Sequence, residues 1–78
     1  MLYPNPAKMD EPFHIKFQLE KESDVSVALF DFSNKLLKSK ELGKIKASEY
    51  TETLSTIGTF LIVVVIDGKA ASAKIIIR

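Results

Sequence analysis

The chain has 78 residues, of which 46% are hydrophobic and 27% charged, a composition typical of one small globular domain rather than a disordered segment. Its formal net charge is +1 and the charges are scattered, so the sequence offers no basic stripe for nucleic acid or anionic lipid. The absence of cysteine excludes a disulfide and a thiolate nucleophile, and the longest apolar run, residues 60–66, is far shorter than the about 20 residues of a membrane-spanning helix.

The chain begins with a segment rich in proline, residues 2–7, which we call the leader. Pro4 and Pro6 remove two backbone donors and restrict the residues before them, Tyr3 and Asn5, to extended conformations. We therefore expect a stiff, extended, non-helical leader in which Asn5 bonds local backbone. The start has no signal-peptide pattern, so we expect a cytoplasmic protein or, with Met1 as an expression start, a piece of a longer exported chain.

Two strands are predicted next. Residues 13–19 alternate strictly between apolar and polar side chains, with Phe13, Ile15 and Phe17 on one face. The charged residues 20–24 predict a turn, and residues 24–32 predict a second strand. We expect the phenylalanines of the chain to lie in the core, namely Phe13, Phe17, Phe30, Phe32 and Phe60.

The middle of the chain is less apolar. Residues 32–35 predict a tight turn, because Asn34 tolerates the left-handed backbone region and Asp31 can accept hydrogen bonds from nearby backbone N–H groups. Residues 36–42 predict a weak strand that Gly43-Lys44 ends, and residues 45–54 predict an edge strand or a strand followed by a loop. The helix-forming residues within 36–48 leave a short helix as the alternative.

The last third gives the strongest strand signal. After a turn at residues 55–58, the β-branched run 60–66 predicts a central strand covered on both faces. Asp67-Gly68 predicts a two-residue type I′ hairpin, and residues 69–78 form the return strand. We therefore predict an all-β fold, an immunoglobulin-like antiparallel β-sandwich of six to seven short strands, in a single domain spanning residues 1–78.

The sequence offers no combination of residues for catalysis. His14 is the single histidine, and one imidazole makes neither a zinc site nor a catalytic triad. The acidic residues at 10–11 and 20–24 could bind calcium in a loop, but their spacing matches no known calcium loop and favours solvated turns. Hairpin geometry explains Asp67-Gly68-Lys69, and Tyr3 and Tyr50 are the rings expected at the surface. We expect no enzyme, no catalytic residue, no metal and no cofactor.

Several motifs follow one another in a fixed order. They are Tyr3-Pro4-Asn5-Pro6-Ala7, then Val25-Ser26-Val27-Ala28-Leu29-Phe30-Asp31 before a turn that ends at Lys35, then Leu54-Ser55-Thr56-Ile57-Gly58-Thr59-Phe60, then Asp67-Gly68-Lys69 and the final Lys74-Ile75-Ile76-Ile77-Arg78. Over nearly all 78 residues this order resembles the type A C-terminal sorting domain of cargo proteins of the type IX secretion system (Por secretion system) of Bacteroidetes.

Two positions depart from the family's pattern. Asn34 stands where glycine is usual and Phe60 where tyrosine is usual. Asparagine also enters the left-handed region readily, and phenylalanine keeps the ring, so both departures preserve the local structure. The resemblance implies a recognition motif made of Tyr3, Pro4, Asn5, Pro6, Ala7, Gly58, Phe60, Gly68, Lys69, Lys74, Ile75, Ile76, Ile77 and Arg78.

The resemblance implies a non-catalytic secretion signal at the end of a larger exported protein. Its cargo, fused N-terminally, enters the periplasm, and the outer-membrane translocon then moves it to the cell surface or the medium. A sortase-like cysteine peptidase removes the domain, which has an immunoglobulin-like fold, no nucleic-acid partner and no membrane insertion. Whether the cargo is anchored or released stays open.

Alternatives remain at this stage. The main alternative is a stand-alone adhesive or carbohydrate-binding β-sandwich module, and a small enzyme is a third, poorly supported reading. The apolar last two strands could offer an edge for strand addition to a partner or for a strand-mediated dimer. If the final residues are recognised, deleting Lys74 to Arg78 is expected to abolish export.

Overall fold

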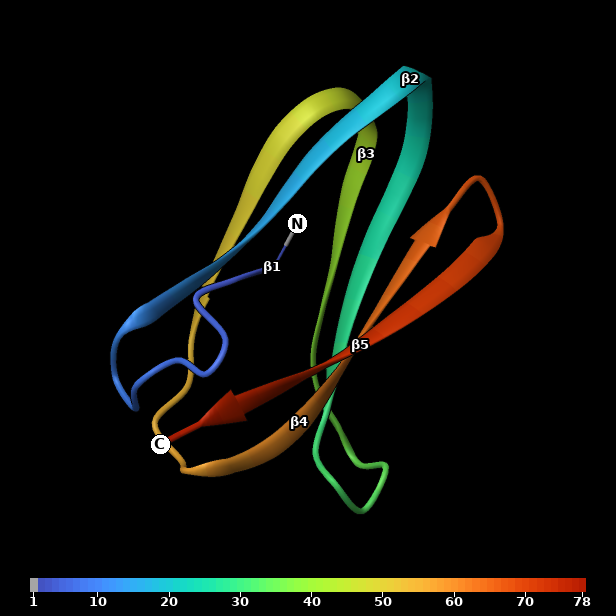
Figure 1. The fold of residues 1–78 in the computed structure, drawn as a ribbon. Helices are drawn as coiled ribbons and strands as arrows, with labels where there is room; N and C mark the ends of the chain where they lie inside the picture. The colour runs from blue at the N-terminus through green and yellow to red at the C-terminus, as the bar shows by residue number, and fades with distance from the viewer. Residues whose placement is uncertain (1) are drawn as a thin grey trace.

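The computed structural model describes residues 2–78 and shows one curled, five-stranded antiparallel sheet (Figure 1). The strands are β1 (Leu2–Tyr3), β2 (Pro12–Phe30), β3 (Leu36–Thr53), β4 (Gly58–Ile66) and β5 (Lys69–Ile77). Their order is β1-β2-β4-β5, and β3 pairs with the remaining edge of β2. The prediction of an all-β chain is confirmed, whereas the expectation about Met1 lies outside the described residues.

Long β2 and β3 replace four shorter predicted strands. The predicted turn at residues 20–24 is wrong, because β2 continues through it and four of its residues, Leu19 to Glu22, bulge opposite Lys46. The predicted break at Gly43-Lys44 is also wrong, since Gly43, with a φ of 75°, forms a second irregularity in a strand that stays paired. The two strands bend together, and the described sheet has five strands rather than six to seven (Figure 1).

The alternative of a helix within residues 36–48 does not occur. This segment belongs to β3, which is hydrogen bonded to β2 along nearly all of its length. Pairing with a long neighbouring strand supplies the backbone hydrogen bonds that a short helix would leave unsatisfied at its ends, and it outweighs the modest helix propensity of Leu, Lys and Glu. As predicted for residues 45–54, β3 is an edge strand.

The core lies on the concave side of the curled sheet. Phe13, Ile15 and Phe17 are buried as their alternation predicted. The prediction of a core position is wrong for Phe32, which is 80% exposed, and for Phe30, which is only partly buried and lies outside the core cluster. Phe32 falls outside β2, in the turn that follows, so no neighbouring strand covers its ring. The buried hydrophobic residues are Ala7, Phe13, Ile15, Phe17, Val25, Val27, Leu29, Leu54, Phe60, Ile62, Ile75 and Ile77.

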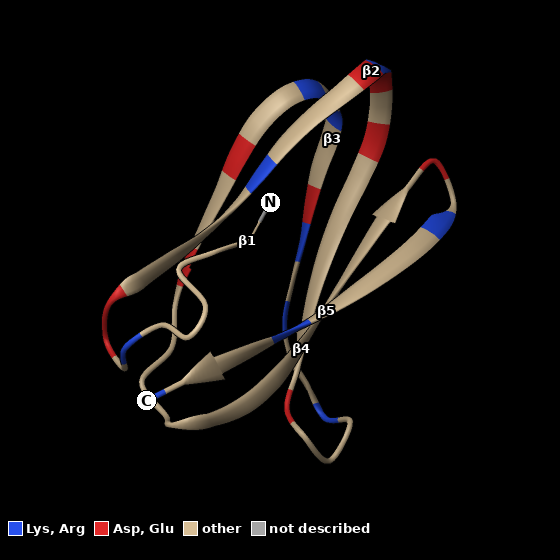
Figure 2. Cartoon of the chain, viewed as in Figure 1, with Lys and Arg blue, Asp and Glu red and all other residues tan. Residues whose placement is uncertain are grey.

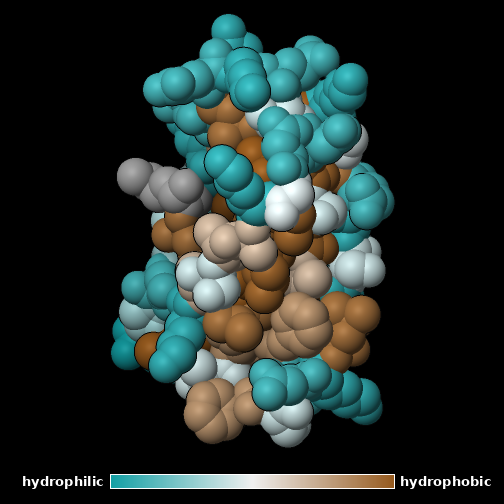
Figure 3. Space-filling model, turned by 90° about the vertical axis from the view of Figure 1, so that its right-hand side faces the viewer, coloured by the Kyte–Doolittle hydropathy of each residue, from teal (hydrophilic) through white to brown (hydrophobic). Residues whose placement is uncertain are grey.

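Strand β4 is central, as predicted, because it pairs with both β2 and β5. Its Phe60 and Ile62 are buried, but Leu61, Val63 and Val65 on the other face are only partly buried. The prediction that both faces are covered is therefore wrong for the outer face. Figure 3 shows hydrophobic side chains along the middle of the side of the molecule nearest the β4–β5 hairpin.

Two predicted turns are confirmed. The Asp31 carboxylate accepts hydrogen bonds from the backbone N–H groups of Lys35 and Ser33, and Asn34 has a φ of 66°. These bonds, the one from Lys35 above all, lower the pKa of Asp31. Asp67 and Gly68 have positive φ values of 48° and 83° and connect β4 to β5 as a two-residue hairpin. Within residues 2–78, no helix has the length and apolar character needed to cross a membrane.

Candidate functional site

The leader runs from β2 to the outer edge of β5. Its first two residues form β1, where Leu2 and Tyr3 pair with β2. Residues 4–6 then bend, so the prediction of one extended stretch is wrong beyond Tyr3. The bend brings the leader to the backbone of β5, and these tertiary contacts decide its course.

Asn5 joins the leader to the last strand. Its side-chain Nδ2 donates to the carbonyl oxygen of Lys74 at 2.9 Å, and the N–H of Ile76 donates to its Oδ1 at 3.1 Å. The side-chain amide thus occupies a donor and an acceptor on the edge of β5, as a neighbouring strand would. The expectation that Asn5 bonds local backbone is wrong, because its partners lie 69 and 71 residues away.

The backbone of the leader continues this pairing. Ala7 lies in a parallel bridge with Ile77: its N–H donates to the Ile76 carbonyl at 2.8 Å, and its carbonyl accepts from the N–H of Arg78 at 2.9 Å. The N–H of Met9 then donates to the carbonyl of Arg78 at 2.9 Å. We call the last residues, Lys74 to Arg78, the tail, and the contact between the leader and the tail the leader–tail junction.

Alternate side chains of the tail point in opposite directions. Ile75 and Ile77 are fully buried, whereas Ile76 is 48% exposed, and Lys74 and Arg78 are exposed. The buried pair anchors the tail to the core beside Ala7, which is also buried. The tail therefore presents two cations and one isoleucine around the leader–tail junction.

Two further predicted site residues support the tail from β4. Gly58 pairs with Ile77 and Phe60 pairs with Ile75. The Phe60 ring is buried, which explains why a phenylalanine is accommodated there. Gly58, the first residue of β4, has a φ of 147°, a backbone conformation that other residues rarely adopt. This backbone conformation explains why glycine occupies the position.

Gly68 and Lys69 lie apart from the other predicted site residues. They belong to the hairpin at the opposite end of β4 and β5, where Ile66 pairs with Lys69. Lys69 is five residues from Lys74 along β5, so the hairpin is about 16 Å from the nearest residue of the leader–tail junction. The structure thus brings together the leader, Gly58, Phe60 and the tail, and it does not bring the hairpin to them.

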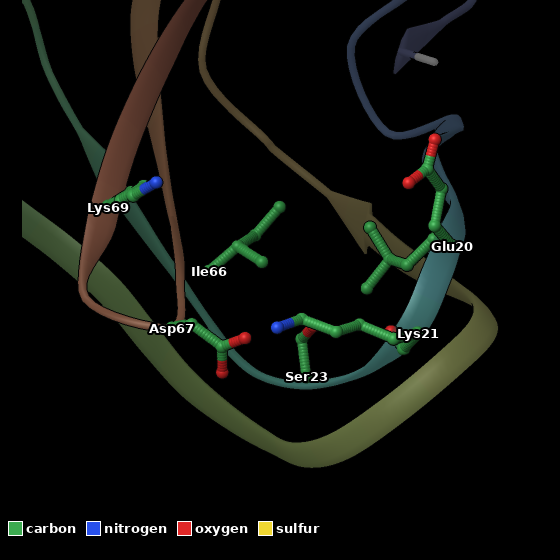
Figure 4. A pocket seen from close by; sticks show the side chains of 7 residues that line it. Glu20, Lys21, Ser23, Ile66, Asp67 and Lys69 are labelled. Atoms are coloured by element: carbon green, nitrogen blue, oxygen red, sulfur yellow. The ribbon is translucent and has the colours of Figure 1, made fainter.

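The hairpin borders a cleft of about 640 Å³ at the bend of β2 (Figure 4). Lys21 extends toward Asp67 across it, while Ile66 lies between the charged residues (Figure 4). The Asp67 carboxylate accepts a hydrogen bond from the N–H of Asp24 at 2.9 Å, which is the main reason that its pKa is lowered. This carboxylate is engaged by the fold, and no group of three or more metal-ligating side chains occurs within residues 2–78.

The sequence analysis missed a polar cluster that contacts the leader at Tyr3. The Tyr3 hydroxyl donates to Glu49 Oε2 at 3.1 Å, and its ring lies 5.3 Å from the ring of His14. His14 Nδ1 is 3.2 Å from Glu49 Oε1 and 3.0 Å from Thr51 Oγ1. Partial desolvation and then the Glu49 contact raise the pKa of Tyr3. The pairing of Tyr3 with His14 across β1 and β2 creates the cluster, and no local motif indicates it.

The fold and the leader–tail junction define a small all-β domain whose beginning and end form one continuous structure. The chain belongs to the family of secretion system C-terminal sorting domains, because the model of that family matches residues 1–78, that is, the full length. Membership marks it as a type IX C-terminal sorting signal of the kind found in Bacteroidetes.

Solved structures share the fold. A crystal structure of dimeric latent PorU from Porphyromonas gingivalis matches 99% of this chain with a TM-score of 0.72 and 20% identity, and the chain spans 9% of that protein's length. The CARDB domain of a Pyrococcus furiosus protein, crystallised in complex with di-metal ions, matches 99% of this chain and 84% of its own length, with a TM-score of 0.54 and 11% identity. No curated protein sequence matches the chain.

Proposed function

We propose that the domain directs an attached cargo protein across the outer membrane through the type IX translocon. The observation that carries this proposal is the family match over residues 1–78, which spans both partners of the leader–tail junction. In this proposal residues 1–78 are a single domain at the end of a larger exported protein, and the cargo precedes the leader.

A folded surface, rather than a linear peptide, is the form in which the signal is recognised. Asn5 and Ala7 are hydrogen bonded to Lys74, Ile76 and Arg78, so the two ends of the domain are presented together. The exposed tail residues of this surface are Lys74, Ile76 and Arg78, and residues Tyr3 to Pro6 of the leader are exposed as well. Lys74, Ile76 and Arg78 supply positive charge and an apolar contact to the translocon, while Asn5 and Ala7 hold the tail in place.

Processing follows export in this proposal. A sortase-like cysteine peptidase removes the domain, and the cargo reaches the cell surface or the medium. Because β1 and Asn5 fix the leader to β2 and β5, the accessible bond for cleavage is in the connection between the cargo and the leader. Transit through the periplasm and a role free of catalysis belong to the same proposal.

We also interpret the curled sheet as an immunoglobulin-like sandwich. Each of β2 and β3 bends in its middle, so each contributes one segment to either layer. If the two halves of β2 and of β3 are counted separately, the five strands become seven segments. Seven is the number of strands in a small immunoglobulin-like domain.

A reporter assay tests the export function. Residues 1–78 are fused behind a reporter that carries a signal peptide, and the fusion is expressed in a bacterium with a type IX system. The reporter is expected at the cell surface or in the medium, and the same fusion lacking residues 74–78 is expected to stay in the periplasm. Periplasmic retention of the intact fusion would contradict the proposal.

Replacing Pro4 and Pro6 with alanine separates two roles of the leader. Loss of folding, measured by circular dichroism, would assign a structural role to these residues. A folded variant that is not exported would assign them to direct recognition by the translocon.

The alternative function is a stand-alone adhesive or carbohydrate-binding module. Such a module uses exposed aromatic rings on one face of a sheet as a binding platform. Phe32 is the most exposed ring, at 80%, but it lies in the turn after β2. A ligand found by glycan-array or calcium titration, together with failure of the export assay, would favour this alternative.

A further inference from the structure

The outer edge of β5 is divided into a covered part and an open part. On the side away from β4, the Lys74 carbonyl, both backbone groups of Ile76 and the Arg78 N–H are bonded to Asn5 and Ala7 of the leader. In an antiparallel strand every second residue directs its N–H and C=O to the same side, so Ala70 and Ser72 face away from β4 as well. Within residues 2–78, no strand pairs with this first half of β5 except β4.

A small apolar cleft lies beside the open part. Its volume is about 110 Å³, somewhat less than the about 150 Å³ of an engineered apolar cavity that holds benzene. Ala71 and Ala73 leave this space because their side chains are short. The cleft is lined by Leu2 and Ile15 on β1 and β2, Ile62 and Val64 on β4, and Ala71, Ser72 and Ala73 on β5.

The leader shows how this edge is used inside the molecule. Asn5 and Ala7 bond to β5 directly after the open part ends. An extended segment placed against Ala70 to Ala73 would therefore continue an edge that the protein already pairs. Alternate side chains of such a segment would point into the apolar cleft.

The charges of β5 define the partner. Lys69 and Lys74 flank the open part, and β5 contains no acidic residue. Five residues apart along a strand, they are about 16 Å from each other. A second copy of the chain would bring its own Lys69 and Lys74 to the same edge without an acid on either β5 to offset them, which disfavours self-pairing.

We infer that the open edge of β5, from Ala70 to Ala73, is a strand-addition site for an extended segment of another protein, with apolar side chains that enter the cleft and acidic residues that flank them. The site adjoins the leader–tail junction and shares only Lys74 with it. This binding site is additional to the proposed export function. Because peptide binding is measured with residues 1–78 alone, a negative binding result would not change the outcome expected in the export assay.

A peptide titration tests the site. The probe is the fluorescently labelled hexapeptide Glu-Thr-Val-Thr-Val-Asp, capped at both ends, and binding to residues 1–78 is followed by anisotropy. We expect a Kd below about 1 mM. A control peptide with lysines in place of both acids, and one with N-methylated valines that cannot pair, are each expected to bind at least about tenfold more weakly.

Two variants locate the binding. Ser72→Pro removes an outward N–H, and proline is tolerated on edge strands, so the fold is expected to persist while the probe binds at least about tenfold more weakly. Ala71→Leu fills the cleft without changing the backbone and is expected to weaken binding similarly. Ala47→Leu is the matched control, because Ala47 is an exposed alanine on β3 that neither belongs to the open edge nor lines the cleft, so binding should be retained.

The outcomes are distinguishable. Unchanged affinity in folded Ser72→Pro, or in Ala71→Leu, would overturn the inference, as would the absence of probe binding to the wild-type chain. Sedimentation of the chain alone gives a second check: a dimer that Ser72→Pro dissociates would show that a second copy occupies the edge and would also overturn it.

Discussion

Two of the edge strands, β3 and β5, avoid unwanted pairing in different ways. β3 carries seven charged residues among its 18 and an irregularity at Gly43, both of which discourage another strand from pairing with its edge. β5 has only Lys69 and Lys74 among nine residues, and the leader covers its last part. Figure 2 shows the difference in charge between the two strands. The edge with little charge is protected by another part of the chain, which makes the leader and the tail one structural unit.

The same contrast holds for the bonds that close the two sides of the sheet. On the β3 side, one side-chain bond joins the two halves of the bent strand: Lys38 donates to the Glu52 carboxylate at 2.8 Å. Tyr50, in the same half as Glu52, also donates to this carboxylate at 2.8 Å. On the β5 side, the leader bonds only to backbone groups of the tail: two bonds involve the Asn5 side chain and two involve the backbone of Ala7. Four substitutions test this comparison.

The largest effect is expected from Ile75→Ala. Ile75 is fully buried in the core beneath the leader–tail junction, and truncation of such a residue costs about 2–5 kcal/mol of unfolding free energy. Ile76→Ala is a matched control at the next position, where the side chain is 48% exposed, and should cost less than about 0.5 kcal/mol. Urea denaturation followed by circular dichroism measures both.

Equal losses for the two isoleucines would show that the tail is not anchored by its inner face. A small loss for both would mean that β5 adds little to the core. Either result would remove the structural distinction between β5 and the polar edge strand β3.

Asn5→Ala is expected to have the second-largest effect. It removes two hydrogen bonds to the edge of β5, for which we expect a loss of about 1–2 kcal/mol, because Asn5 is exposed and water replaces part of the interaction. Amide hydrogen exchange measured by NMR should accelerate at Ile76, whose N–H donates to Asn5, more than at Ile75, whose N–H faces β4. Unchanged protection of the Ile76 amide would show that the leader does not protect the tail.

Glu52→Gln tests the side-chain bonds of β3 and should cost about 1 kcal/mol at neutral pH. Burial raises the pKa of Glu52, but hydrogen bonds from Lys38, the Thr53 backbone and Tyr50 together outweigh it, so the pKa is lowered overall. A lowered folded-state pKa gives stability that is present above the unfolded value of about 4.3 and is lost as the pH falls through the folded value.

The difference in unfolding free energy between wild type and Glu52→Gln should therefore shrink on acidification from pH 7 toward about pH 3. Denaturation at several pH values measures it. A difference that is independent of pH would mean that the charge of Glu52 is not what joins the two halves of β3. Tyr50, whose pKa burial and Glu52 raise to about 12, stays neutral throughout this range.

Local patterns in the sequence predicted much of the fold. Alternation identified the buried faces around Phe13 to Phe17, and the turn chemistry of Asp31, Asn34, Asp67 and Gly68 was confirmed. The bends in β2 and β3 were mistaken for ends of strands, because charged residues and glycine mark bulges as readily as turns. Only the partner strand shows which of the two occurs.

The candidate site was predicted as a set of residues but not as a structure. The resemblance supplied both the leader and the tail, yet nothing local places Asn5 against Lys74 and Ile76, about 70 residues further along the chain. Likewise, the open edge at Ala70 to Ala73 depends on where the leader stops. Contacts between distant segments follow from the whole fold, which strand periodicity does not encode.

The smallest effect is expected from Lys38→Met. Lys38 Nζ lies 2.8 Å from Glu52 Oε2, but its side chain is 48% exposed, so the ion pair is partly screened by solvent. Partly exposed pairs contribute about 0.2–1 kcal/mol, and the loss should decrease further at high salt. Lys40→Met, which removes a charge from the same strand without touching Glu52, is the control. Lys38→Met could instead lose as much unfolding free energy as Asn5→Ala at every salt concentration. β3 and β5 would then depend equally on single tertiary contacts, and charge alone would not explain how β3 remains an unpaired edge.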